Sequence, residues 1–245
     1  MLHAPPGGTA LAYRHCAGAG PLIVFLPGYM SDMRGSKAQA VFSWAQAEGR
    51  SCLLLDYAGC GESAGEFAHG TLSRWRDDVL ALIEHVGAER VVLVGSSMGG
   101  WLMLLVALRL GDRIAGLVGI AAAPDFTEWG YPPQLKAQLA AGEMVFEDNN
   151  YGPEPMPTHA AFWADGQANR LLDDEIAIDC PVRLIHGQND TDVPWETALR
   201  LAAALRSPDV QVALVKDGDH RLSRPSDIAL LLRTLDTLCA HIHDA

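Results

Sequence analysis

Short runs of apolar residues without polar alternation recur along the chain, and longer segments with helical spacing lie between them. Unbroken apolar runs are typical of strands that are buried on both faces of a sheet. Apolar residues at every third or fourth position instead predict helices with one buried face. The predicted strands are 21–26, 52–55, 91–94, 114–121, 181–185 and 210–215, with 9–16 as an antiparallel edge strand. The predicted helices are 36–48, 72–86, 98–110, 194–205 and 225–241.

Strands that alternate with helices predict an α/β fold, in which a mostly parallel central sheet has helices on both faces. A chain of 245 residues that is 49% hydrophobic is long enough for one large core. No linker rich in Pro, Ser or Gly divides it. We therefore expect residues 1–245 to form a single domain.

The segment 124–179 differs in character from the rest of the chain. Prolines and aromatic residues crowd it, and helical patches are predicted only at 133–141 and 158–171. An apolar insertion that prolines interrupt, placed between two core strands, predicts a small helical lid over the carboxyl edge of the sheet. The alternative interpretation is ordinary surface packing.

Charge and cysteine content narrow the class of protein further. The net charge of −12 and a pI near 5.1 argue against a nucleic-acid partner and against an anionic membrane surface. The five cysteines are widely spaced and form no C-x-x-C motif, so neither a disulfide framework nor a zinc site is indicated. No signal segment and no run of ~20 apolar residues is present. We expect a cytoplasmic protein without stable membrane insertion.

The stretch Gly95-Ser96-Ser97-Met98-Gly99 lies between a predicted strand and an almost wholly apolar helical segment. A sharp strand-to-helix turn strains the backbone of its central serine and needs a glycine two residues away on either side. Ser97 is therefore a candidate nucleophile. Because the helix begins at Met98, the backbone N–H of Met98 is placed to donate to an oxyanion. A turn without chemistry is the alternative, since a chain with 24 glycines can match this motif by chance.

With this strand, turn and helix, the chain resembles the α/β-hydrolase superfamily. The resemblance implies an α/β-hydrolase fold, an acid after a later strand and a histidine after the last strand. It also implies that loop 27–33 supplies a second oxyanion donor, the backbone N–H of Tyr29, and that Gly28 allows a close backbone approach. The alternative for this loop is an ordinary strand-to-helix turn.

Asp190 is the candidate acid, because it follows the predicted strand 181–185. A carboxylate in that place can accept the imidazole N–H and fix the tautomer of the ring. Asp192 is the competing candidate, although it is better placed to cap or precede the helix 194–205. His186 is interpreted as a packing residue at the strand end and not as a catalyst.

His220 is the candidate general base. Of the nine histidines, only His220 lies in a loop directly after the last predicted strand, 210–215. The chain order of Ser97, Asp190 and His220 is also the order that the superfamily uses.

A more specific resemblance extends over nearly the whole chain apart from the lid. The matching blocks are 26–33, 37–38, 56–61, 71–80, 95–104, 180–187, 193–195 and 219–221. They are similar to those of the mitochondrial palmitoyl-protein thioesterases, also known as acyl-glucuronide esterases, and their bacterial relatives. This resemblance implies that acyl thioesters or activated esters, including S-acylated proteins, are hydrolysed through an acyl-enzyme without a metal or cofactor. The lack of an amino-terminal transit extension suggests a bacterial cytosolic member.

Two other functions stay open. A general short-chain carboxylesterase would use the same three side chains on smaller substrates. A catalytically silent binding protein could also have this fold, because architecture alone does not imply chemistry.

Overall fold

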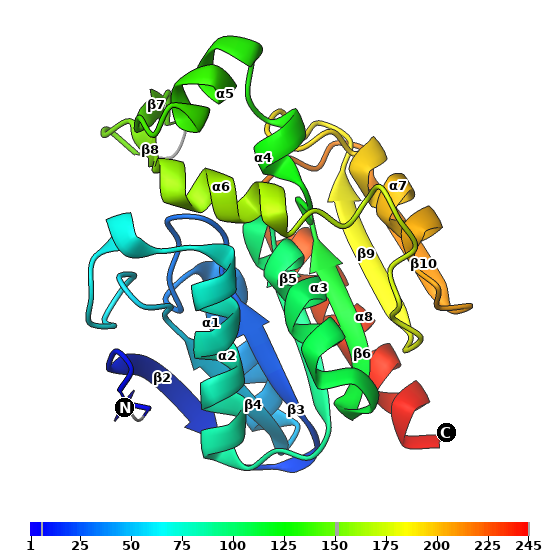
Figure 1. The fold of residues 1–245 in the computed structure, drawn as a ribbon. Coiled ribbons are helices and arrows are strands. Elements are labelled where there is room, and N and C mark those ends of the chain that lie inside the picture. Colours follow the sequence, from blue (N-terminus) through cyan, green and yellow to red (C-terminus); the bar gives the residue numbers. More distant parts are fainter. Residues whose placement is uncertain (6, 150–151, 245) are drawn as a thin grey trace.

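The computed structural model describes residues 1–5, 7–149 and 152–244. Residues 6, 150, 151 and 245 fall within the predicted domain and lid bounds and lie outside the described residues. Figure 1 shows a twisted central sheet with helices on both of its faces, which confirms the predicted α/β architecture.

The central sheet has the strand order β1-β2-β4-β3-β5-β6-β9-β10. Its strands are β1 (Leu2–His3), β2 (Leu11–Cys16), β3 (Ala19–Leu26), β4 (Arg50–Leu55), β5 (Val91–Ser96), β6 (Ile114–Ile120), β9 (Val182–Gly187) and β10 (Val210–Val215). All neighbours from β4 to β10 pair in parallel, whereas β2 pairs antiparallel with β4 and β1 antiparallel with β2. The parallel strands therefore end at one common edge, where polar residues after different strands can meet.

The helices divide between the two faces of the sheet. They are α1 (Ser36–Ala47), α2 (Leu72–Val86), α3 (Met98–Leu110), α4 (Phe126–Trp129), α5 (Pro133–Ala140), α6 (Ala160–Ala168), α7 (Glu196–Ala204) and α8 (Pro225–Asp244). Two short 3₁₀ turns are Phe67–His69 and Gly111–Arg113. One apolar cluster joins α1 and α8 to the sheet, and a second joins α2, α3 and α7 to the opposite face.

Helix α3 lies at the centre of the second cluster. Ten of its residues, from Met98 to Ala107, are buried, as its lack of a polar face predicts. Helix α2 beside it begins with a hydrogen bond from the Arg74 amide to the Thr71 hydroxyl at 3.2 Å. It ends at Gly87, whose φ of 74° glycine adopts without steric cost.

The segment between β6 and β9 first lies above the carboxyl edge of the sheet, with α4, α5 and α6, and after α6 it returns beside the sheet to the opposite edge, where β9 begins (Figure 1). It contains α4, α5, α6 and an antiparallel hairpin of β7 (Val145–Glu147) and β8 (Met156–Thr158). We call this segment, residues 121–181, the insertion. Helix α6 is shorter than the predicted patch 158–171, because Thr158 belongs to β8.

Two further boundaries differ from the sequence-based prediction. The predicted edge strand 9–16 is β2, but β1 pairs outside it through Leu2 and Ala12. Helix α7 begins at Glu196 and not at 194, because Trp195 occupies the position before the first turn. Within the described part of the chain, no helix combines the length and the apolar character that crossing a bilayer requires.

Candidate active site

Ser97 lies at the junction of β5 and α3 with φ 56° and ψ −121°. A positive φ is strained for a residue with a side chain, and tight packing on both sides holds it here. A Cβ at Gly99 would lie 2.1 Å from the Leu26 carbonyl oxygen, and one at Gly95 would lie 2.3 Å from the Gly99 carbonyl oxygen. Only glycine fits at these two positions, so the turn places the Ser97 side chain beyond the end of β5.

The main chain of Ser97 is anchored to the end of β6 and to the residues that follow it. Its amide donates to the Ile120 carbonyl at 2.9 Å. Its carbonyl accepts from the amides of Gly100 at 2.8 Å and Ala123 at 3.1 Å. The backbone that presents the hydroxyl is therefore fixed from both sides.

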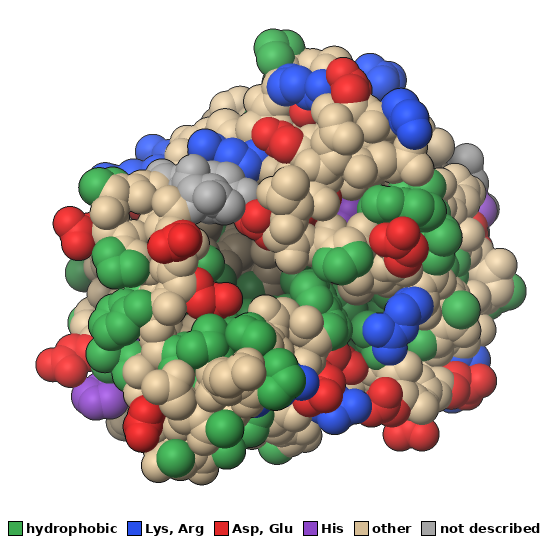
Figure 2. All heavy atoms as spheres, turned by 90° about the horizontal axis from the view of Figure 1, so that it is seen from above, with side chains coloured by type: hydrophobic (Ala, Val, Ile, Leu, Met, Phe, Trp, Pro, Cys, Tyr) green, Lys and Arg blue, Asp and Glu red, His purple; other side chains and the backbone are tan. Residues whose placement is uncertain are grey.

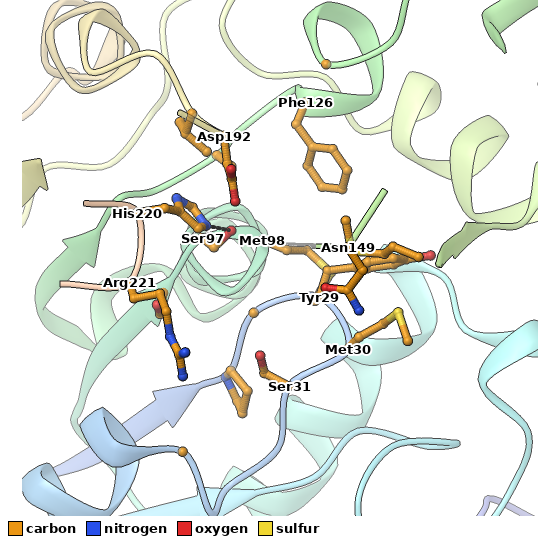
Figure 3. A pocket seen from close by; sticks show the side chains of 18 of the residues that line it. Tyr29, Met30, Ser31, Ser97, Met98, Phe126, Asn149, Asp192, His220 and Arg221 are labelled. Atoms are coloured by element: carbon orange, nitrogen blue, oxygen red, sulfur yellow. Dashed lines mark hydrogen bonds between the residues drawn. The ribbon is translucent and has the colours of Figure 1, made fainter. Parts of the chain in front are cut away.

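The structure brings the three predicted side chains together from three separate loops. The Ser97 hydroxyl lies 3.1 Å from Nε2 of His220, and Figure 3 shows these two groups facing each other. Nδ1 of the same ring lies 2.8 Å from Oδ2 of Asp190. Asp190 follows β9 and His220 follows β10, so the parallel strands account for their meeting at one edge.

The carboxylate of Asp190 has no exposed surface, yet it is held in its charged form. Its Oδ1 accepts from the amides of Asp192 at 2.9 Å and Val193 at 2.8 Å. Burial alone raises the pKa of Asp190. Hydrogen bonds from His186, His220 and the Val193 amide, together with the charge interaction with His220, outweigh burial and hold that pKa well below its usual value.

Asp192 lines the pocket beside these residues, and its own backbone amide supports Asp190. The structure does not form the helix cap that the sequence suggested for Asp192. The position before α7 is Trp195, and α7 has no hydrogen bond from a capping side chain. Asp192 instead precedes the helix, in the turn that follows Asp190.

The two predicted oxyanion donors are the amides of Tyr29 and Met98, and Figure 3 shows both residues on the same side of Ser97. Met98 is the first residue of α3. A Cβ at Gly28 would lie 3.3 Å from Cβ of Ser97, so loop 27–33 passes against the serine. Among the described residues, neither amide donates a hydrogen bond to a protein acceptor.

Loop 27–33 is braced from the loop that follows β4. The buried carboxylate of Asp56 accepts from the amides of Met33 and Glu62, both at 2.8 Å. The hydroxyl of Tyr57 donates to the Pro27 carbonyl at 3.0 Å. The braces fix the main chain on both sides of Gly28 and Tyr29.

A pocket of about 590 Å³ opens beside Ser97 and extends under the insertion. The apolar and aromatic side chains that line it include Tyr29, Met30, Phe126, Trp129, Tyr131 and Met156. Arg221 lies on the side of the pocket that contains His220 (Figure 3), and the Lys37 ammonium donates to the Arg221 carbonyl. Figure 2 shows this face of the molecule, where apolar and acidic side chains border a hollow.

One contact at this site was not foreseen from the sequence. His186 is fully buried, as predicted, but its Nε2 lies 3.2 Å from Oδ2 of Asp190. The sequence carries no signal for this contact apart from its position four residues before the candidate acid. Within the ranges 1–5, 7–149 and 152–244, no group of three or more His, Cys, Asp or Glu side chains could hold a metal ion.

Comparison with known proteins gives consistent matches. The model of the alpha/beta hydrolase family matches residues 23–229. Human palmitoyl-protein thioesterase ABHD10, mitochondrial, is 38% identical over 232 residues, which cover 93% of this chain and 76% of the human protein.

Two solved structures are similar over almost their full length. The mouse alpha/beta hydrolase domain-containing protein 10 has a TM-score of 0.92 and 35% identity, and the match covers 99% of this chain and 98% of the mouse chain. A putative hydrolase from Agrobacterium vitis S4 has a TM-score of 0.90 and 38% identity, with 97% and 96% of the two chains covered.

Proposed function

Since the chain belongs to the alpha/beta hydrolase family, we propose that this hydrolase cleaves acyl thioesters or activated esters through Ser97, His220 and Asp190. The observation that carries the proposal is the hydrogen-bonded series from the Ser97 hydroxyl to His220 at 3.1 Å and on to the buried Asp190 at 2.8 Å. A serine, a base and an orienting acid in this geometry are what nucleophilic acyl transfer requires.

The acylation step uses His220 first as a base and then as an acid. Nε2 takes the proton of Ser97 while Oγ attacks the acyl carbon, and the amides of Met98 and Tyr29 donate to the developing oxyanion. The bond to the leaving group then breaks, and His220 gives its proton to the departing sulfur or oxygen. Asp190 stabilises the imidazolium that exists between these two transfers.

Deacylation repeats the same proton transfers with water. His220 accepts a proton from water as the water oxygen attacks the acyl carbon of the enzyme ester. The bond to Ser97 Oγ breaks, the proton returns to Oγ and the free acid leaves. The two steps of this proposed mechanism use only residues of the protein, the substrate and water.

Thioesters and activated esters are the proposed substrates for two reasons. Thiolates and stabilised alkoxides are better leaving groups than amines, so this geometry favours ester chemistry over peptide hydrolysis. The pocket of about 590 Å³ contains a group of aromatic and apolar side chains, among them Phe126, Trp129 and Met156, beside its polar residues, and this group suits an acyl chain. The name of the human relative as a palmitoyl-protein thioesterase supports an S-acylated protein as one substrate. A cytoplasmic location stays a prediction.

The proposal is tested with Ser97→Ala, for which we expect turnover to fall by on the order of 10⁴-fold or more. The variant should also lose labelling by a fluorophosphonate, while its Tm stays close to that of the native chain. Ser43→Ala is the matched control, because Ser43 is exposed on α1. Turnover that persists in Ser97→Ala would refute the nucleophile.

The substrate class is tested by comparing kcat/KM across thioesters and oxygen esters of increasing acyl length. We expect thioesters with long acyl chains to be hydrolysed fastest. A maximum at acetyl or butyryl oxygen esters would instead identify a short-chain carboxylesterase. Labelling of Ser97 without turnover of any member of the series would identify a binding protein.

A further inference from the structure

We propose that His186 is a positioning residue that orients Asp190 for catalysis. The inference rests on the proposed function, because it concerns the acid of the same three-residue series. It departs from the sequence-based interpretation, in which His186 only packs at the end of β9.

The four contacts of the Asp190 carboxylate divide evenly between its oxygens. Oδ1 accepts from two backbone amides, those of Asp192 and Val193. Oδ2 lies 2.8 Å from Nδ1 of His220 and 3.2 Å from Nε2 of His186. The oxygen that orients the proposed base thus has a second, fully buried histidine beside it.

The surroundings of His186 assign its proton to Nε2. This nitrogen lies 3.1 Å from the Val193 carbonyl oxygen and 3.2 Å from Oδ2 of Asp190, and both of these neighbours are acceptors. Nδ1 is buried and has no hydrogen-bond partner among the described residues. A ring that carries a hydrogen on Nε2 donates to the Val193 carbonyl and places the same N–H beside Oδ2 of Asp190.

This arrangement gives His186 two connected effects. Its bond to the Val193 carbonyl closes the turn whose amides hold Oδ1, and its contact with Oδ2 limits rotation of the carboxylate. An apolar side chain of similar size would fill the space but would leave the Val193 carbonyl without this donor. Asp190 could then rotate away from Nδ1 of His220, and the imidazole would lose its fixed orientation.

The test compares His186→Leu, which removes the donor, with His186→Gln, whose amide nitrogen has about the reach of Nε2. We expect Leu to lower kcat roughly tenfold with KM changed less than about twofold, because the loss concerns the reacting groups and not binding. We expect Gln to restore kcat to within about threefold of the native value. His85→Leu, which removes an exposed histidine from the end of α2, is the control and should leave kcat unchanged.

A double-mutant cycle separates positioning from packing. If His186 acts through Asp190, His186→Leu should cause less than about a twofold further loss in an Asp190→Asn background. Three results would each overturn the proposal. They are an equal loss of kcat in both backgrounds, a rise in KM with unchanged kcat, and a kcat in His186→Gln no higher than in His186→Leu. If the Leu variant does not fold, the test compares His186→Gln with the shorter His186→Asn. We expect kcat of the Asn variant to be roughly tenfold lower than that of the Gln variant. Equal kcat values in the two variants would overturn the proposal.

The proposed function and this inference fail in different ways. Turnover that survives Ser97→Ala would remove the proposed function itself. Loss of turnover in Ser97→Ala together with full kcat in His186→Leu would overturn only the role of His186.

Discussion

Burial raises the pKa of both Asp190 and the half-buried Asp78, but the net pKa shifts of the two carboxyls are opposite, because they have different numbers of donors. Asp190 has donors on both oxygens, and its pKa is lowered although burial raises it. Asp78 on α2 accepts from the Ala58 amide at 2.8 Å. Burial raises the pKa of Asp78 to about 6, against the effects of this bond and of Arg74. The number of donors to a carboxylate therefore determines how much of the pKa increase caused by burial is offset.

Asp78→Asn is expected to stabilise the protein at neutral pH. The carboxyl has a higher pKa in the folded chain, about 6, than in the unfolded chain, about 3.9, so its ionisation opposes folding. The amide keeps an acceptor for Ala58 and removes that charge. We expect a gain of about 1–3 kcal/mol in the free energy of unfolding above pH 6.

The pH dependence of this gain is its check. The gain should be absent below about pH 4, where Asp78 is protonated in both states, and should grow between pH 4 and 6. Urea unfolding of both proteins at pH 4, 5 and 7 measures it. A gain of equal size at all three pH values would show that the charge of Asp78 is not its cause.

The sequence predicts the residues of the candidate site and the contact of Asp190 with His220, but not the contact of His186 with Asp190. Ser97, Asp190 and His220 were selected because each follows a predicted strand and fits a known chain order. The position of His186 beside Oδ2 depends on how the turn 187–193 curls back to β9. Spacing along a chain carries no information about which oxygen of a carboxylate a buried ring meets.

At the scale of elements, Tyr29 joins loop 27–33 to the insertion. Its hydroxyl donates to the Pro157 carbonyl of β8 at 2.8 Å. Its ring packs against Phe162 of α6 with centroids 4.9 Å apart, and against Phe67 at 5.1 Å. The residue proposed to supply a backbone oxyanion donor is thus held by its side chain from the insertion.

Tyr29→Phe should therefore affect the hairpin β7–β8 and the chemistry together. It removes one partly buried hydrogen bond, worth about 1 kcal/mol, while it keeps the ring. We expect amide hydrogen exchange in the described parts of 145–158 to accelerate about fivefold and kcat/KM to fall severalfold. Exchange monitored by mass spectrometry and steady-state kinetics are the measurements.

Tyr13→Phe provides the matched control, because the Tyr13 hydroxyl is hydrogen-bonded to His85 at the far end of α2. It should leave exchange in the hairpin unchanged. If Tyr29→Phe changes neither exchange nor kcat/KM, the insertion and loop 27–33 are independent.

Long, strongly patterned elements were predicted within a few residues, and short ones were missed. The core strands and the five long helices follow from unbroken apolar runs and helical spacing. Strands β1, β7 and β8 have two or three residues, which is too few for any alternation to show. In β8, Pro157 faces Phe146, and a proline argues against a strand when only the sequence is read. Helix α4 has only four residues.

At the scale of the whole molecule, the parallel sheet brings the three candidate catalytic side chains together. Ser97, Asp190 and His220 are separated by up to 123 positions, and they meet because β5, β9 and β10 point the same way. The sequence predicted this layout because strands alternate with helices. It could not predict the shape of the insertion, since its structure depends on packing against aromatic residues of α2 and loop 27–33.

The acidic character of the whole chain predicts how it meets lipid-bound substrates. A net charge of −12 should oppose approach to an anionic bilayer. We expect hydrolysis of an acyl ester embedded in phosphatidylglycerol vesicles to be severalfold slower than in phosphatidylcholine vesicles at low salt. The difference should shrink in 0.5 M NaCl, about the concentration at which screening becomes strong. Equal rates at low salt would show that the charge lies away from the approaching face.

The two hydrogen bonds that tie the backbone of Ser97 to Ile120 and Ala123 also set a mechanical boundary. The first residues after β6 are hydrogen-bonded to the nucleophile's backbone, so they cannot move without displacing Ser97 as well. A rearrangement of the insertion that leaves the nucleophile in place therefore has to be confined to residues beyond Ala123.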